Sequence, residues 1–129
     1  MKLLLDTHIW VWSVADPSRL AQRVRREMSS PENELWLSPV SVWEALALHA
    51  KRRLEMEGGV RSWMAKATEQ IHEAPLTYEI VIAAFESPLD HADPADRFLA
   101  ATADVLDLTL VTADRKLLGL GHIATLANR

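Results

Sequence analysis

Short apolar runs alternate with longer segments of helical periodicity along most of the chain. The apolar runs lie at 2–5, 34–37, 71–76 and 108–112, and a weaker fifth run spans 122–126. Runs of this length are typical of buried strands, and their alternation with helical segments is typical of βαβ units. The pattern predicts an α/β fold with a mainly parallel central sheet of about five strands and helices on both faces.

The intervening segments are expected to be helical. We expect helices near 18–29, 39–54, 59–70, 78–87 and 94–106, and a short one after Asp114. Two of these starts carry a strong signal, because Ser38 and Asp93 are each followed by a proline, which places a capping side chain before a proline at the first helical position. A chain of 129 residues without repeats or linkers suits a single domain, 1–129.

The composition indicates which compartment and which kinds of site the chain is suited to. The chain has no cysteine, so it has neither a disulfide framework nor a thiolate zinc site, and the cytoplasm is the default expectation. The segment MKLLLDTHIW becomes charged after a few apolar residues, so we interpret it as a first strand, too short for a signal peptide or a membrane span. The formal net charge of −4 does not exclude a nucleic-acid ligand, because three or four of the acids are candidate metal ligands, and without them the surface is nearly neutral.

Four acidic residues fall at strand ends or on the buried side of the next helix. They are Asp6, Glu44, Asp96 and Asp114. The carboxyl ends of parallel strands open onto one crevice, so these side chains should converge there. At ~5 Å and an effective dielectric of about 20, each pair of carboxylates would repel by roughly 3 kcal/mol. No lysine or arginine lies inside the apolar segments that would line such a crevice, and all-oxygen ligation suits Mg²⁺ or Mn²⁺. Metal-assisted phosphate chemistry is the leading hypothesis.

Each acid also has a plainer explanation. Asp6 and Asp114 follow strands and so are candidate helix N-caps. Glu44 points along an apolar helix face, where an unpaired carboxylate is costly, so a plain surface position explains it poorly. Asp96 lies in the first turn of its helix, where a negative charge offsets exposed amides. Asp93 is expected to be the N-cap of that helix, and a role beside the metal is the alternative.

Four stretches carry a further signal when they are taken together. They are Leu3–Trp10, Ser41–Glu44, His91–Ala103 and Leu110–Lys116. In this order, and in a chain of this length, they resemble the PIN-domain nucleases, and within them the VapC-type toxins of toxin–antitoxin pairs. The resemblance implies a three-layer α/β/α fold and an Mg²⁺ or Mn²⁺ site made by the four acids. It also implies endoribonuclease activity inhibited by a small VapB-like antitoxin, and a toxin that forms a homodimer.

The implied chemistry is hydrolysis without a covalent enzyme intermediate. One or two ions would lower the pKa of a water, orient it for in-line attack on a phosphodiester and stabilise the leaving oxygen. The hydroxyls of Thr7 and Thr112 are candidates for holding a ligand or water, although a threonine at a strand edge is usually structural. His8 and His91 are further candidates for a place beside the ligands.

Two surfaces are candidates for contacts with RNA or a partner. Arg19, Arg23 and Arg26 recur at helical spacing, and Lys51 to Arg53 end the Glu44 helix; such stripes either follow an RNA backbone or are solvated faces. Of the five tryptophans, Trp36 and Trp43 are expected in the core. Trp10 and Trp12 cannot both face inward if their segment is helical, because residues two apart diverge by about 200°. With Trp63 and Met64 they suggest an apolar groove for a partner's helix or extended segment, the place where an antitoxin tail binds in the resembling family.

Two competing functions belong to other classes. A haloacid-dehalogenase-type phosphatase also begins with an acid after a leucine-rich strand, but it needs a second aspartate two residues later, where this chain has His8. A non-catalytic PIN-like binding module would use its acids only as caps and act with a DNA-binding partner. Metal-dependent RNA cleavage that is lost on changing Asp6 would separate these readings.

Overall fold

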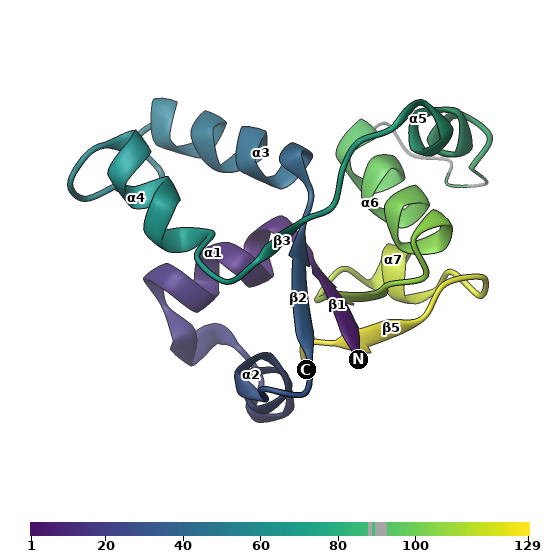
Figure 1. Ribbon diagram of the computed structural model, residues 1–129, viewed down its shortest axis with the longest axis horizontal. Helices are drawn as coiled ribbons and strands as arrows, with labels where there is room; N and C mark the ends of the chain where they lie inside the picture. The colour runs from purple at the N-terminus through teal and green to yellow at the C-terminus, as the bar shows by residue number, and fades with distance from the viewer. Residues whose placement is uncertain (88, 90–92) are drawn as a thin grey trace.

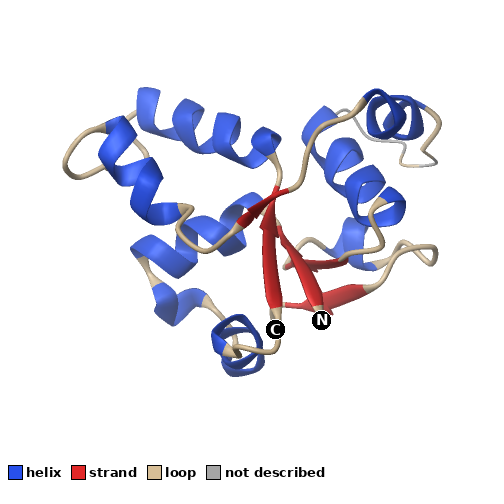
Figure 2. Cartoon of the chain, in the orientation of Figure 1, coloured by secondary structure: helices blue, strands red, loops and turns tan. Residues whose placement is uncertain are grey.

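A computed structural model describes residues 1–87, 89 and 93–129, and it shows a central sheet with helices on both faces (Figure 1, Figure 2). The strands are β1 (Lys2–Leu5), β2 (Glu34–Leu37), β3 (His72–Glu73), β4 (Thr109–Thr112) and β5 (Thr125–Ala127). The helices are α1 (Thr7–Ala15), α2 (Gln22–Ser29), α3 (Pro39–Ala50), α4 (Val60–Ala67), α5 (Tyr78–Phe85), α6 (Pro94–Val105) and α7 (Arg115–Leu118), with a 3₁₀ turn at Pro17–Arg19. None of the described helices has the length and apolar character that crossing a membrane requires.

The described strands form one sheet in the order β3-β2-β1-β4-β5, and every neighbouring pair is parallel. This confirms the predicted parallel sheet and places β1 at its centre. Leu3 of β1 pairs with Leu35 of β2 on one side and with Thr109 of β4 on the other. The chain builds outward from β1 in one direction through β2 and β3, and later in the other through β4 and β5. In such sheets a ligand crevice opens where the direction changes, at the carboxyl ends of β1 and β4.

Alternate residues of β1 enter two different cores. Leu3 and Leu5 are buried against α1, α2 and α4, whereas Leu4 is buried on the opposite face with residues of α6 and α7. Successive strand side chains point to opposite faces, so an unbroken leucine run is what a strand covered on both sides needs. Figure 1 shows α1 to α4 on one side of the sheet and α5 to α7 on the other. The three-layer arrangement is therefore as expected.

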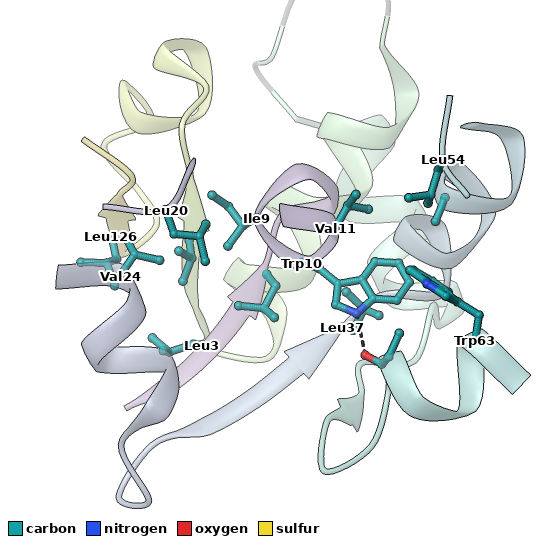
Figure 3. Close-up of a cluster of buried hydrophobic side chains, with 14 of the residues drawn as sticks. Leu3, Ile9, Trp10, Val11, Leu20, Val24, Leu37, Leu54, Trp63 and Leu126 are labelled. Atoms are coloured by element: carbon teal, nitrogen blue, oxygen red, sulfur yellow. Dashed lines mark hydrogen bonds between the residues drawn. The ribbon is translucent and has the colours of Figure 1, made fainter. Parts of the chain in front are cut away.

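The first core is closed by a pair of tryptophans (Figure 3). Trp10 of α1 is wholly buried, and its indole N–H donates to the carbonyl of Ala67 at 2.7 Å. Its ring packs edge-on against Trp63 of α4, with 5.7 Å between ring centroids. A buried indole needs such an acceptor for its N–H. The contact fixes α4 against α1, the helix that begins at the candidate site.

Several predicted elements are shorter than expected. The helix predicted at 18–29 divides, because Leu20 is extended (φ −88°, ψ 134°) between the 3₁₀ turn and α2. The helix predicted at 39–54 ends at Ala50, before Arg52, whose φ of 59° is left-handed. The strand predicted at 71–76 pairs with β2 only at His72 and Glu73. The pairing goes no further because β2 itself ends at Leu37, and Ser38 is already the N-cap of α3.

The helical periodicity does not predict a helix at 7–15, where α1 lies. The sequence THIWVWSVA is apolar on nearly all sides, so no single stripe marks it. Trp10 is buried and Trp12 is only partly buried, which confirms that the two indoles diverge. The core position expected for Trp43 is wrong, because its side chain is 70% exposed on α3. Trp36 is partly buried and lies on the ring of His72, with 4.8 Å between centroids.

Candidate active site

The four acids that the sequence singled out line one cleft of about 380 Å³ at the carboxyl end of the sheet. Asp6 follows β1, Asp114 follows β4, Glu44 lies in the second turn of α3 and Asp96 lies in the first turn of α6. The other residues that line the cleft are His8, Trp12, Asp93 and Ala113. Segments separated by up to 108 positions thus meet at the predicted place.

Asp6 is both a helix cap and a member of this cluster. Its Oδ1 accepts the N–H of Thr7 at 2.8 Å, so it is the N-cap of α1. Its Oδ2 accepts the hydroxyl of Thr112 at 2.6 Å, and the same hydroxyl oxygen accepts the N–H of Asp114 at 3.0 Å. Asp114 in turn caps α7 by accepting the N–H of Lys116. Thr112 therefore ties together the two acids that follow the central strands.

Glu44 is held by the buried hydroxyl of Thr7, which in turn contacts the buried hydroxyl of Ser41. Thr7, on α1, donates its hydroxyl hydrogen to Oε1 of Glu44 and lies 2.9 Å from the hydroxyl oxygen of Ser41. A hydroxyl has one hydrogen, so while Thr7 donates to Glu44 it can only accept from Ser41. Ser41 is fully buried, and its place in the site was not expected from the sequence. Its position three residues before Glu44 on one helix face was the available signal.

Three carboxylates in this cleft resist ionisation, those of Asp6, Glu44 and Asp96. Burial, and after it the charges of Asp93, Asp114, Asp6 and Glu44 in that order, together raise the pKa of Asp96 to about 7. Burial also raises the pKa of Asp6 and that of Glu44, against the lowering effect of the hydrogen bonds from Thr112 and Thr7 respectively. Negative charge in this cleft is therefore in excess, as the sequence predicted.

Asp93 has the structural role that was expected, and it also acts on the cleft. Its Oδ1 accepts the N–H of Ala95 at 3.0 Å, which makes it the N-cap of α6. Its charge raises the pKa of both Glu44 and Asp96. His8 has the opposite effect, because it lowers the pKa of Asp6 and of Glu44. His91 lies outside the described residues.

The donor chemistry of the cleft fits a hard divalent cation. The acids offer only carboxylate oxygens, and the raised pKa values of Asp6, Glu44 and Asp96 indicate that a bound cation would stabilise their ionised forms. Within the described part of the chain, no three histidine or acidic side chains already form a group that could hold a metal ion.

The four residues expected to form a partner groove do not share one surface. Trp10 and Trp63 are buried in the first core, and Trp12 lines the acidic cleft. Met64 opens instead onto two adjoining hollows of about 350 and 500 Å³, which it lines together with Val42. The reason is geometric: adjacent residues on α4 diverge by about 100°, so Trp63 and Met64 face different neighbours. The predicted groove is wrong as defined, and an apolar groove lies between α3 and α4.

A second apolar surface was not foreseen. On α5, Tyr78 is 91% exposed and Phe85 is 82% exposed, with Val81 and Ile82 partly exposed between them on the same helix face. Apart from Glu79, the segment YEIVIAAF is apolar throughout, so its periodicity did not reveal which face would remain uncovered. Exposed apolar patches of this kind mark interaction sites.

The basic stripes are solvent-facing, as both of their interpretations require. Arg23 and Arg26 of α2 are exposed while Val24 is buried, and Lys51 to Arg53 are exposed beyond α3. Arg19 differs from the others, because its guanidinium lies over the ring of Trp12, 4.6 Å from the centroid. RNA contact by these residues stays a prediction.

Comparisons with known proteins agree with this arrangement. The family model described as PIN domain matches residues 3–122. Ribonuclease VapC22 of Mycobacterium tuberculosis (strain ATCC 25618 / H37Rv) is 31% identical over 121 residues, which cover 93% of this chain and 92% of that protein.

Solved structures share the fold across the whole length. A DNA-bound VapBC from Salmonella typhimurium matches with a TM-score of 0.76 at 13% identity, covering 100% of this chain and 99% of that one. VapBC-1 from nontypeable Haemophilus influenzae matches with a TM-score of 0.69 at 20% identity, covering 98% of each chain. Since the family model spans nearly the whole chain and a named relative is 31% identical, this protein belongs to the PIN-domain family.

Proposed function

We propose that this protein is a metal-dependent endoribonuclease of the VapC kind, which hydrolyses RNA phosphodiester bonds in the cytoplasm with Mg²⁺ or Mn²⁺. The observation that carries the proposal is the convergence of Asp6, Glu44, Asp96 and Asp114 on one cleft with excess negative charge. The relative that is 31% identical is named a ribonuclease, which supports the same activity.

The four acids would hold the ion, and each is positioned by the fold. When bound, a divalent ion supplies Lewis acidity, which lowers the pKa of a water and neutralises charge on the leaving oxygen. Thr112 aims one oxygen of Asp6, and Thr7, supported by Ser41, aims one oxygen of Glu44. Such support keeps carboxylates in a fixed orientation, which metal sites need for both affinity and activity.

The cleft favours water as the nucleophile. The chain has no cysteine, and the hydroxyls of Thr7 and Thr112 already donate to carboxylates. Among the described residues, neither hydroxyl is hydrogen-bonded to a histidine that could activate it as a nucleophile. Direct hydrolysis in one step, without a covalent intermediate, is therefore the reaction class that these residues support.

We propose two protein partners. The solved neighbours are named VapBC complexes, and a small VapB-like antitoxin suits the apolar groove between α3 and α4, beside Glu44. A second copy of this chain suits the uncovered face of α5. With 150–250 Å² for each fully exposed aromatic side chain, Tyr78 and Phe85 alone present roughly 300 Å², a large part of the apolar core of an interface of about 800 Å² per partner.

The test is RNA cleavage by purified protein with Mg²⁺ or Mn²⁺. Asp6→Asn and Asp96→Asn should each abolish cleavage while the circular dichroism spectrum is kept. Asp104→Asn is the matched control, because Asp104 is exposed at the other end of the helix that carries Asp96. If wild type cuts no RNA with either ion but binds DNA together with its partner, the non-catalytic binding module is the better description. Full cleavage by Asp96→Asn would remove Asp96 from the site.

A further inference from the structure

Three side chains form a stack at the rim of the acidic cleft, which we call the Trp12 stack. Its members are His8 and Trp12 of α1 and Arg19 of the 3₁₀ turn. The rings of His8 and Trp12 lie 5.7 Å apart between centroids, at an interplanar angle of 49°, as residues four apart on one helix face can. The guanidinium carbon of Arg19 lies 4.6 Å from the centroid of the Trp12 ring. His8 and Trp12 also line the cleft that holds the four acids.

Trp12 is more exposed than a tryptophan that serves only to fill the core. Trp10, two residues earlier, is wholly buried and its indole N–H has a backbone acceptor. Trp12 is only partly buried, and its indole N–H makes no hydrogen bond to any of the described residues. An indole with an open ring edge and a free donor at the mouth of a cleft is available to a ligand.

Arg19 places a positive charge beside a cleft that is lined mainly by acidic side chains. It is exposed, and among the described residues it forms no ion pair, although acids line the cleft that its aromatic partner borders. Its contact is with the π-face of Trp12, a cation–π arrangement that holds both groups in place. The guanidinium hydrogens therefore stay free for an anionic group such as a phosphate.

We propose that the Trp12 stack binds one unpaired nucleotide of the RNA next to the bond that is cut. The base stacks on the open side of the Trp12–Arg19 pair, and the phosphate of that nucleotide accepts hydrogen bonds from the guanidinium of Arg19. The proposal rests on the ribonuclease function proposed above and adds the position and kind of a substrate contact. Proteins that bind single-stranded RNA commonly combine an aromatic face for the base with a cation for the backbone.

This contact has consequences for which RNA is bound. Every base has a π-face, so stacking on Trp12 discriminates little among the four bases. In a duplex both faces of a base are covered by its neighbours, so a paired nucleotide cannot use the stack without leaving the helix. The Trp12 stack thus selects single-stranded segments such as loops, and base preference has to come from other contacts.

The experiment separates binding from cleavage by using the Asp96→Asn background, which does not cut. Binding of a fluorescein-labelled single-stranded RNA, and of the same RNA annealed to its complement, is followed by anisotropy. Trp12→Leu keeps an apolar side chain without a π-face, and Trp12→Phe keeps a π-face. Trp43→Leu is the matched control, since Trp43 is 70% exposed on α3 and does not line the cleft. Melting curves establish that each variant is folded.

Trp12→Leu should weaken binding of single-stranded RNA about 10-fold, with Trp12→Phe and Trp43→Leu within about twofold of the parent. Arg19→Gln should weaken binding and lower the dependence of log Kd on log salt concentration by about one unit. Equal binding by Trp12→Leu and the parent, equal losses in Trp12→Leu and Trp12→Phe, or equal affinity for duplex and single strand would each overturn the proposal. If Trp12→Leu alone, without the Asp96→Asn change, still cleaves RNA at the wild-type rate, the proposed role of the Trp12 stack is refuted, whereas the ribonuclease function is not.

Discussion

Thr112 offers the sharpest test of how the acids are held. Its side chain is fully buried, and its one hydroxyl donates to Asp6 at 2.6 Å and accepts from the N–H of Asp114 at 3.0 Å. Thr112→Val has nearly the same shape and the same preference for strand, so it removes the two hydrogen bonds with little other change. Loss of a hydrogen bond to a charged group costs about 1.5–3 kcal/mol, and water can replace the bond to Asp114 at the cleft rim.

We therefore expect Thr112→Val to lower the free energy of unfolding by about 2–3 kcal/mol, a fall in melting temperature of roughly 6–12 °C for a domain of this size. The hydrogen bond from Thr112 lowers the pKa of Asp6, so its loss raises that pKa and weakens ion binding. Urea unfolding at pH 7, with and without Mn²⁺, measures both effects.

Two matched variants isolate the hydroxyl. Thr112→Ser keeps the hydroxyl and loses a buried methyl, which costs about 1 kcal/mol, and it should keep the Mn²⁺ response of wild type. Thr109→Val removes a hydroxyl from the same strand that makes no hydrogen bond within the described residues, so it should be nearly neutral. If Thr112→Val and Thr109→Val unfold within about 0.5 kcal/mol of each other, the hydroxyl bridge does not hold the acids.

Three further outcomes are expected. The pKa of Asp96 is raised to about 7 in the metal-free fold, so folding keeps a proton that the unfolded chain releases near pH 4, and stability should fall as pH rises through that window. Asp96→Asn should flatten this decline between pH 5 and pH 8, as measured by thermal melting in EDTA. An equal slope in wild type and Asp96→Asn would contradict the raised pKa of Asp96. Mg²⁺ or Mn²⁺ should raise the melting temperature of wild type in a concentration-dependent way, and less at pH 5 than at pH 8; indifference to both ions up to tens of millimolar would count against the site. Phe85→Glu should convert a dimer to a monomer in sedimentation or light scattering, with Glu79→Gln on the same helix as the control; a wild type that is monomeric at high concentration would refute the α5 interface.

The sequence was sufficient for the features that rest on local rules. The runs at 2–5 and 34–37 became strands with those bounds, since a leucine-rich run covered on both faces has few other conformations. Asp6 and Asp114 were placed together because parallel strands end at a common edge, and they are joined by Thr112. The same rule does not choose between cap and ligand, and Asp6 shows why: one oxygen caps α1 while the other faces Thr112.

The expectations that the sequence could not supply concern which face of a helix is covered by a neighbouring element. Trp43 and Phe85 are as apolar as Trp10, yet they are exposed, because no described element packs over their sides of α3 and α5. Residue type cannot reveal this, since large apolar side chains are common both in cores and at interfaces. Ser41 was passed over for the opposite reason: a buried hydroxyl becomes informative only when its acceptor is known, and Thr7 comes from a different helix.

The central place of β1 has a consequence for the order of synthesis. The first strand leaves the ribosome early, but it stays unpaired on one side until β4 has been made, more than 100 residues later. Asp6 gains its bonds to Val111 and Thr112 only then, and Asp114 appears later still. Contacts between residues so far apart in sequence form late in folding. A nascent chain therefore lacks two sides of the acidic cleft until Asp114 has been translated, so ribosome-bound fragments that end before Asp114 hold no complete site.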